Sequence, residues 1–245
     1  ANLFKRRCGV GLDISHLRPE DAPVNNSART TTGAWSFADF YSYVCRMIGQ
    51  NGRRGALMIT MDIRHPDIEK FVAMKHDLTK VTGANVSVKI SDSFMQAVES
   101  NESFNLHFPI GSDNPTHTKE IQAVELWDSI VESATKTAEP GLLMWDNITK
   151  FLPAEEYADD GFKTVTTNPC GEIPLSELEL EKLDTIIDAC DTVDEKELWK
   201  KLKIACANGR RTGLGTHGLA DALSCLRLSY DSPKANKTMG KIYET

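Results

Sequence analysis

Short apolar runs along the chain alternate with segments whose apolar residues recur at helical spacing. The short runs predict buried strands at residues 8–14, 56–63, 85–91 and 141–145. The helical spacing predicts helices at residues 36–48, 66–75, 92–100 and 119–137. The apolar face of the first helix comprises Phe37, Phe40, Tyr41, Val44, Cys45 and Ile48. Strand-like and helix-like segments in alternation indicate α/β architecture.

The segments between these elements are polar or irregular. Loops are expected at residues 17–32, 49–55, 76–84 and 101–119. Residues 164–175 show neither helical nor strand periodicity, and two further helices are expected near residues 177–190 and 195–207. Capping-box patterns, Ser36 with Asp39 and Thr192 with Glu195, predict where two of the helices begin.

Length and composition describe an ordinary globular chain. Its 245 residues, 40% hydrophobic and 26% charged, suit one large α/β domain or two small ones. The net charge of −7 argues against a general nucleic-acid binder. No apolar run approaches the roughly 18 residues that a membrane span needs, and the first residues do not resemble a signal peptide. We therefore expect a cytoplasmic protein with neither nucleic acid nor membrane as a partner.

The six cysteines are sparse. None forms a C-x-x-C pair, and no Cys/His cluster has zinc spacing, so no metal site is expected. Most of these thiols are interpreted as small buried apolar residues. Cys170 is the exception because of the residues around it.

Residues 166–175 carry the candidate chemistry. Asn168, Cys170 and Glu172 occupy alternate positions, so in an extended loop their amide, thiol and carboxylate would share one face. Pro169 and Pro174 stiffen the chain, which favours a rigid loop that presents three groups to one cavity. Two alternatives remain open at this point. One is a proline-rich turn with a buried cysteine; the other is an acyl-transfer cysteine enzyme, which needs a basic partner such as histidine.

The same segment resembles a known family. Residues 168–175, with the sequence Asn-Pro-Cys-Gly-Glu-Ile-Pro-Leu, are similar to the finger-loop signature N-x-C-x-E of ribonucleotide reductases. Further segments resemble that family in the family's own order: residues 8–19, 52–56, 139–143 and 210–215. The resemblance covers nearly the whole chain. It implies part of a ten-stranded α/β barrel, with an effector and substrate loop half at 1–92, barrel strands and finger loop at 93–176, and a helical segment with a following strand at 177–245.

The resemblance implies roles for individual residues. Cys170 would become the thiyl radical that abstracts the 3′ hydrogen of the substrate, Glu172 the base on the 3′ hydroxyl, and Asn168 a hydrogen-bond partner of the ribose. Two loops would bind substrate or a deoxynucleoside triphosphate effector, through Gln50, Arg53, Arg54 and Gly55 in one and Asn25, Ser27 and Arg29 in the other. Gly9 and Gly11 are interpreted instead as residues that permit tight packing of a barrel strand.

Proline before and glycine after the cysteine resemble the adenosylcobalamin-dependent class II enzymes most. The alternative is the large subunit of a class I enzyme, which receives its radical from a metal-containing subunit. Either reading implies a ribonucleotide substrate, a thioredoxin-type reductant and a homodimer. A catalytically inactive nucleotide-binding fragment is the third hypothesis.

The sequence departs from the family pattern in its redox cysteines. The family reduces its substrate with a cysteine pair on neighbouring strands, which Cys8 does not match. Cys190 lies at a comparable distance after the finger loop, but on the apolar face of an expected helix, so we interpret it as a core residue. The junction after Ser176 and the end at Thr245 predict a fragment, a gapped chain or one part of a split enzyme.

Overall fold

The computed structural model describes residues 2–5, 8–48, 55–160 and 163–176 without interruption, and shorter stretches between residues 192 and 243. The chain divides into two compact units, Ala1–Arg211 and Thr212–Thr245. The helix α10 (Pro233–Tyr243) lies in the second unit. All other elements discussed below lie in the first.

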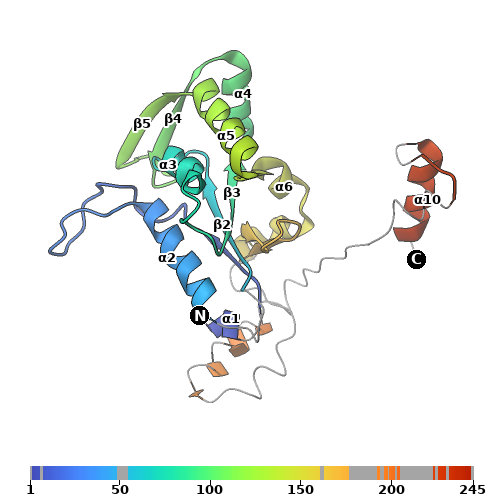
Figure 1. Ribbon diagram of the computed structural model, residues 1–245, viewed down its shortest axis with the longest axis horizontal. Coiled ribbons are helices and arrows are strands. Elements are labelled where there is room, and N and C mark those ends of the chain that lie inside the picture. The colour runs from blue at the N-terminus through green and yellow to red at the C-terminus, as the bar shows by residue number, and fades with distance from the viewer. Residues whose placement is uncertain are drawn as a thin grey trace. The chain divides into compact units, whose positions relative to one another are not determined.

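A parallel sheet forms the centre of the first unit. Its four strands are β1 (Val10–Asp13), β2 (Leu57–Asp62), β3 (Asn85–Ile90) and β6 (Gly141–Met144), hydrogen-bonded in that order. Helix α2 (Ala34–Met47) connects β1 to β2, and α3 (Ile68–Ala73) with a short 3-10 turn at Met74–His76 connects β2 to β3. In Figure 1, α2 lies to the left of β2 and β3, and α6 (Trp145–Phe151) lies to their right. The expected α/β architecture is confirmed.

The two faces of the sheet differ in chemistry. Residues that alternate along β2 and β3 on one face are apolar and join the core beneath the helices: Leu57, Ile59, Met61, Val86, Val88 and Ile90. The opposite face carries polar side chains that are nonetheless buried: Thr60, Asp62, Ser87 and Lys89. We call this second side the inner face. A strand covered on both faces explains why β2 is buried at every position.

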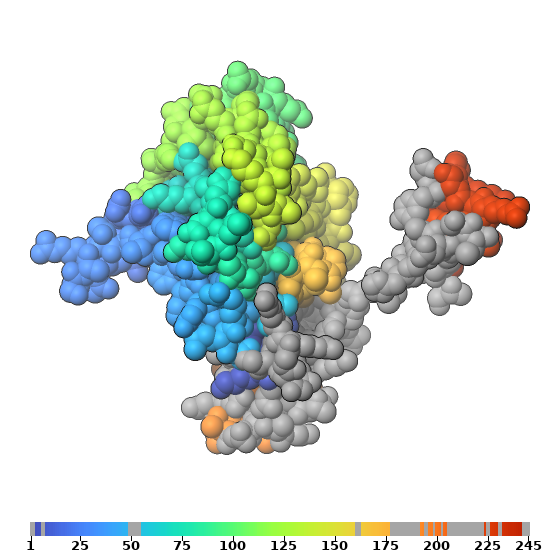
Figure 2. All heavy atoms as spheres, in the orientation of Figure 1, coloured from blue at the N-terminus to red at the C-terminus, as the bar shows by residue number. Residues whose placement is uncertain are grey.

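An insertion between β3 and β6 corrects one sequence expectation. It contains α4 (Asp92–Ser100), an antiparallel hairpin of β4 (Ser103–Phe108) and β5 (His117–Gln122), and α5 (Ala123–Thr137). These elements, in green, form the top of the first unit in the view of Figure 2. About half of residues 101–119, expected as a loop, is therefore strand, and the long helix begins four residues later than expected. The missed signal is the alternation of Phe104, Leu106 and Phe108.

The start of α2 corrects a second expectation. Its N-cap is Gly33 rather than Ser36, and the Ser36 hydroxyl donates back to the Gly33 carbonyl over 2.8 Å. Asp39 accepts a hydrogen bond from the Val81 amide instead of closing a capping box. A carboxylate distant in sequence caps the helix: Asp67 accepts from the Ala34 amide at 2.8 Å. The second capping-box pattern, at Thr192 and Glu195, lies partly outside the described residues.

None of the helices within the described ranges is long and apolar enough to cross a membrane. The same part of the chain contains no group of three or more His, Cys, Asp or Glu side chains that could hold a metal ion.

Candidate active site

The segment with the candidate chemistry is a tight antiparallel hairpin. Strands β7 (Thr164–Thr167) and β8 (Pro174–Ser176) pair with each other and flank a turn at residues 168–173. The Asn168 carbonyl accepts from the Gly171 amide at 3.0 Å, which closes a β-turn around Pro169 and Cys170. Gly171 has φ +86°, a conformation that favours glycine. The extended conformation expected for residues 168–172 is wrong, because the chain reverses there.

Asn168 stabilises this turn with its own side chain. Its Oδ1 accepts from the Ile173 amide at 3.0 Å, and its backbone amide donates to the Ile173 carbonyl at 3.1 Å. Asn168 is half-buried, whereas Cys170 and Glu172 are exposed at the tip of the hairpin. The hairpin therefore offers a thiol and a carboxylate to solvent from a braced turn, and the oxygen of the amide is already engaged.

The hairpin packs directly on the first strand of the sheet. A Cβ placed on Gly11 would lie 1.9 Å from the Thr167 carbonyl oxygen, and one on Gly9 would lie 2.7 Å from Pro169 Cγ. Contacts under 3.0 Å are essentially never made by real Cβ atoms, so no side chain fits at either position. The interpretation of Gly9 and Gly11 as tight-packing residues is confirmed, and their partner is the hairpin that carries Cys170.

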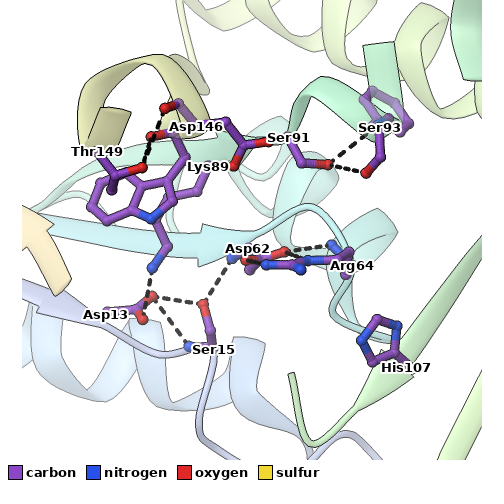
Figure 3. A network of polar contacts seen from close by, with 12 residues as sticks. Asp13, Ser15, Asp62, Arg64, Lys89, Ser91, Ser93, His107, Asp146 and Thr149 are labelled. Carbon is purple, nitrogen blue, oxygen red and sulfur yellow. Dashed lines mark hydrogen bonds and ion pairs between the residues drawn. The ribbon is translucent and has the colours of Figure 1, made fainter. Parts of the chain in front are cut away.

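Buried charged side chains of the inner face, among them Asp13 and Lys89, form one polar layer (Figure 3). Lys89 Nζ lies 2.9 Å from Asp13 Oδ2, with only 7% and 6% of the two side chains exposed. Lys89 also donates to the Val165 carbonyl of β7 at 3.2 Å and lies 4.5 Å from the centre of the Trp145 ring. The ion pair therefore joins strands β1 and β3 and reaches the root of the hairpin.

A second carboxylate continues this layer. Burial alone would raise the pKa of Asp62, but the hydrogen bonds and charge of Arg64, together with the charge of Lys89, hold that pKa below its usual range. Arg64 donates to both Asp62 oxygens, at 2.8 and 2.6 Å, and the Ser15 hydroxyl donates to Asp13 at 2.6 Å. Sequence reasoning missed these residues. The available signal was Lys89, a charge at an alternate position of an otherwise apolar strand.

The acyl-transfer alternative needs a basic partner for Cys170. Within the described residues no histidine hydrogen-bonds Cys170, and His217 lies outside them. The one buried histidine among the described residues, His65, is engaged elsewhere: its Nδ1 accepts from the Asp67 amide and its Nε2 donates to the Leu17 carbonyl. The observation that would favour acyl transfer is therefore missing from this part of the chain.

Two further thiols are described, and neither resembles a reactive one. Cys8 is half-buried and Cys45 is buried. Burial raises the pKa of both thiols, so both remain protonated near neutral pH. Cys190, the other residue considered for the redox pair, lies outside the described residues.

The predicted effector loop is a small ordered turn between β1 and α2. Val24 and Arg29 close it through the Val24 amide and the Arg29 carbonyl at 2.8 Å, and Asn25, Ser27 and Arg29 are exposed at its tip. Both ends of the loop are tied to one side chain, because Asp67 accepts from the amides of Glu20 and Ala34.

The predicted substrate loop is described only at its end. Gln50, Arg53 and Arg54 lie outside the described residues. Gly55 packs against the neighbouring helix α2, since a Cβ on it would lie 2.7 Å from Cys45 Sγ. A packing role for Gly55 is thus visible, whereas the ligand roles of this loop stay predictions.

A parallel α/β sheet with a cysteine-tipped hairpin on its buried polar face is consistent with part of an α/β barrel. Residues 1–183 match the family model described as ribonucleotide reductase, barrel domain. The chain belongs to this family.

Similar proteins agree with this assignment. A vitamin B12-dependent ribonucleoside-diphosphate reductase of Thermoplasma acidophilum is 31% identical over 263 residues, which cover 96% of this chain and 33% of the relative. The protein of the same name from Mycobacterium tuberculosis H37Rv is 31% identical, covering 96% of this chain and 36% of its own length. The ribonucleoside-diphosphate reductase large subunit of Acanthamoeba polyphaga mimivirus is 24% identical over 302 residues, with 100% and 34% covered. The chain thus spans about a third of the length of the curated relatives it matches.

Proposed function

We propose that this chain carries the radical site of an enzyme that reduces ribonucleotides to deoxyribonucleotides. The observation that supports this most is Cys170, an exposed thiol at the tip of a braced hairpin on the inner face of a ribonucleotide reductase barrel domain. In this role Cys170 loses its thiol hydrogen atom and then takes the hydrogen atom from C3′ of the ribose. A braced turn favours this step because reacting atoms must be held in contact distance and orientation.

The residues beside Cys170 have supporting roles in the proposal. Glu172, exposed on the same turn, accepts the proton of the 3′ hydroxyl as a general base. Asn168 contributes in two ways: its Oδ1 braces the turn through the Ile173 amide, and its NH₂ group remains a donor for the ribose. The expected role of Asn168 as a ribose ligand is thus refined: its NH₂ group would contact the ribose, while its Oδ1 stabilises the turn.

We propose adenosylcobalamin as the cofactor, as the names of the Thermoplasma and Mycobacterium relatives state a vitamin B12 dependence for those proteins. When bound, this group supplies radical chemistry through its carbon–cobalt bond. The residues of the hairpin fit such a partner: the thiol is exposed, and a Cβ placed on the neighbouring Gly171 would meet no heavy atom closer than 4.0 Å. The class I large subunit remains the second candidate, because the mimivirus relative is named as a large subunit.

The remaining partners follow from the same family assignment. A deoxynucleoside triphosphate effector would contact Asn25, Ser27 and Arg29, and the substrate would contact Gln50, Arg53, Arg54 and Gly55. A thioredoxin-type reductant would restore the enzyme in the cytoplasm.

Helix α2 supports the homodimer in this proposal. Phe40 and Met47 on its outer side are 58% and 66% exposed, and Phe37 and Tyr43 continue the same apolar stripe. An exposed apolar stripe of this kind is typical of a protein–protein contact. A second copy of the chain would cover it.

The test is tritium exchange between the 5′ carbon of labelled adenosylcobalamin and solvent, with a ribonucleotide and a deoxynucleotide effector present. It is run on this chain and on a chimera in which the flanking segments of the Thermoplasma acidophilum relative complete it. Exchange that is lost in Cys170→Ala supports the proposal. A folded chimera that binds the cofactor without exchange contradicts the cobalamin assignment and favours the class I alternative.

A further inference from the structure

Contacts between the hairpin and the sheet repeat in a regular pattern. Gly11 of β1 faces Thr167, and Gly9, the residue just before β1, faces Pro169. On β3, Lys89 bonds the Val165 carbonyl at 3.2 Å and Asn85 bonds the Pro169 carbonyl at 2.8 Å. On both strands, each step forward along the sheet corresponds to an equal step backward along the hairpin. Strand β7 and the start of its turn therefore cross the inner face antiparallel to β1 and β3, in one defined register.

These contacts differ in whether they can fix the register of the hairpin on the sheet. Gly9 and Gly11 allow close approach, but a surface without side chains offers no directional bond and would tolerate sliding. The Thr60 and Thr166 hydroxyls, 3.2 Å apart, add one short-range contact. Lys89 and Asn85 are the donors that bind specific hairpin carbonyls at two separate points. They lie four residues apart on β3 and therefore on the same face.

We propose that Asn85 and Lys89 are positioning residues that set the register of the hairpin and thereby the position of Cys170 along the inner face. Lys89 acts at the root of the hairpin, where Asp13 holds its ammonium group. Asn85 acts at the tip, on the carbonyl of the residue directly before Cys170. The importance of this register for catalysis rests on the function proposed above for Cys170.

The register matters because strand geometry converts small slips into large displacements. A slip of two residues preserves which side chains face the sheet and moves Cys170 by about 7 Å, at roughly 3.4 Å per residue. Hydrogen abstraction requires reacting atoms about 3–3.5 Å apart. A displaced register therefore removes the thiol from its substrate even when the hairpin remains folded.

The test measures position rather than stability. Nitroxide labels are attached to Cys170 and to the exposed α5 position after Asp128→Cys, in the full chain with its other cysteines replaced by alanine. Pulsed electron–electron double resonance then gives the distribution of distances between the labels. Asn85→Asp keeps the shape of the side chain but turns a carboxylate oxygen toward the Pro169 carbonyl. Lys89→Met removes the root contact, and Lys89→Arg is the conservative replacement that retains a donor. Asn114→Asp, in an exposed loop, is the matched control.

We expect one narrow distribution in the parent, in Lys89→Arg and in Asn114→Asp. Loss of one contact raises the displaced population about fivefold, so Asn85→Asp and Lys89→Met gain a second, shifted peak. A distance distribution that stays narrow and unshifted in Asn85→Asp overturns the proposal. Because Asn85 is exposed, this variant keeps the test valid even if Lys89→Met fails to fold. The measurement uses neither substrate nor cofactor. If the label distances shift in the variants but no Cys170-dependent tritium exchange is found, the proposed function alone is refuted. If exchange is found but the label distances do not shift in the variants, the positioning role alone is refuted.

Discussion

Replacement of Gly11 by alanine gives the sharpest test of how the hairpin sits on the sheet. The new Cβ would lie 1.9 Å from the Thr167 carbonyl oxygen and 2.9 Å from Thr166 Cγ2. Because the closest partner is backbone, no side-chain rotation relieves the clash, and the hairpin must move to make room. Overpacking of this kind costs about 1–3 kcal/mol of the free energy of unfolding. For a unit of this size we expect Tm to fall by about 2–4 °C for each kcal/mol.

The effect on the proposed reaction should be much larger than the effect on stability. A misplacement of about 1 Å can lower a rate by about a hundredfold, so tritium exchange in Gly11→Ala should nearly vanish while the protein still melts cooperatively. Gly240→Ala in α10 is the control, since a Cβ there meets no heavy atom within 4 Å. A Gly11→Ala protein with the parent's Tm would refute the close packing of β1 against the hairpin. A lowered Tm with undiminished exchange would refute the link between hairpin position and Cys170 chemistry.

Three further predictions follow from other contacts. Lys89→Met leaves the buried Asp13 carboxylate without its positively charged partner and should lower the free energy of unfolding by about 3–5 kcal/mol. Adding Asp13→Asn should recover part of that loss in denaturant titrations. Burial lowers the pKa of His65 in the folded protein, so the unfolded chain binds a proton at this imidazole more readily. The free energy of unfolding should therefore fall as pH drops below about 6.5. His65→Gln should flatten this dependence between pH values of about 7.5 and 5.5; Asp67, whose pKa burial raises, acts in the opposite direction at lower pH. Phe40→Glu should shift the chain toward monomer in sedimentation velocity, and an unchanged sedimentation coefficient would contradict a dimer through α2.

The elements that the sequence predicts best are those whose pattern is set by one buried face. Helix α4 is expected at residues 92–100 and is found at Asp92–Ser100, because Ser91 caps its Phe94 amide and Asn101 ends it in a left-handed conformation. The apolar runs at β2 and β3 are equally clear. These elements depend on local periodicity and local caps, which a sequence displays directly.

The elements that the sequence does not predict depend on partners distant in the chain. The N-terminus of α2 is capped by Asp67, 33 residues after Ala34, so the local capping-box pattern at Ser36 is misleading. Strands β7 and β8 are three or four residues long, and β8 begins with proline, which hides their pairing from any periodicity analysis. The motif around Cys170 is recognisable as chemistry, but its β-turn depends on Gly171 and on the Asn168 side chain, which spacing alone does not reveal.

The polar character of the inner face can be explained by the hairpin that packs on it. An apolar face would bury as much surface, but it would place no directional constraint on a hairpin that carries few sheet hydrogen bonds of its own. Lys89 supplies that constraint through its hydrogen bond to the Val165 carbonyl of β7, and the contact between the Thr60 and Thr166 hydroxyls adds to it. Their burial is costly unless each is paired, and Asp13 and the carbonyls of the hairpin provide the pairing. A hairpin that left this face would leave part of that polar layer without partners, and this cost opposes any departure of Cys170 from its register.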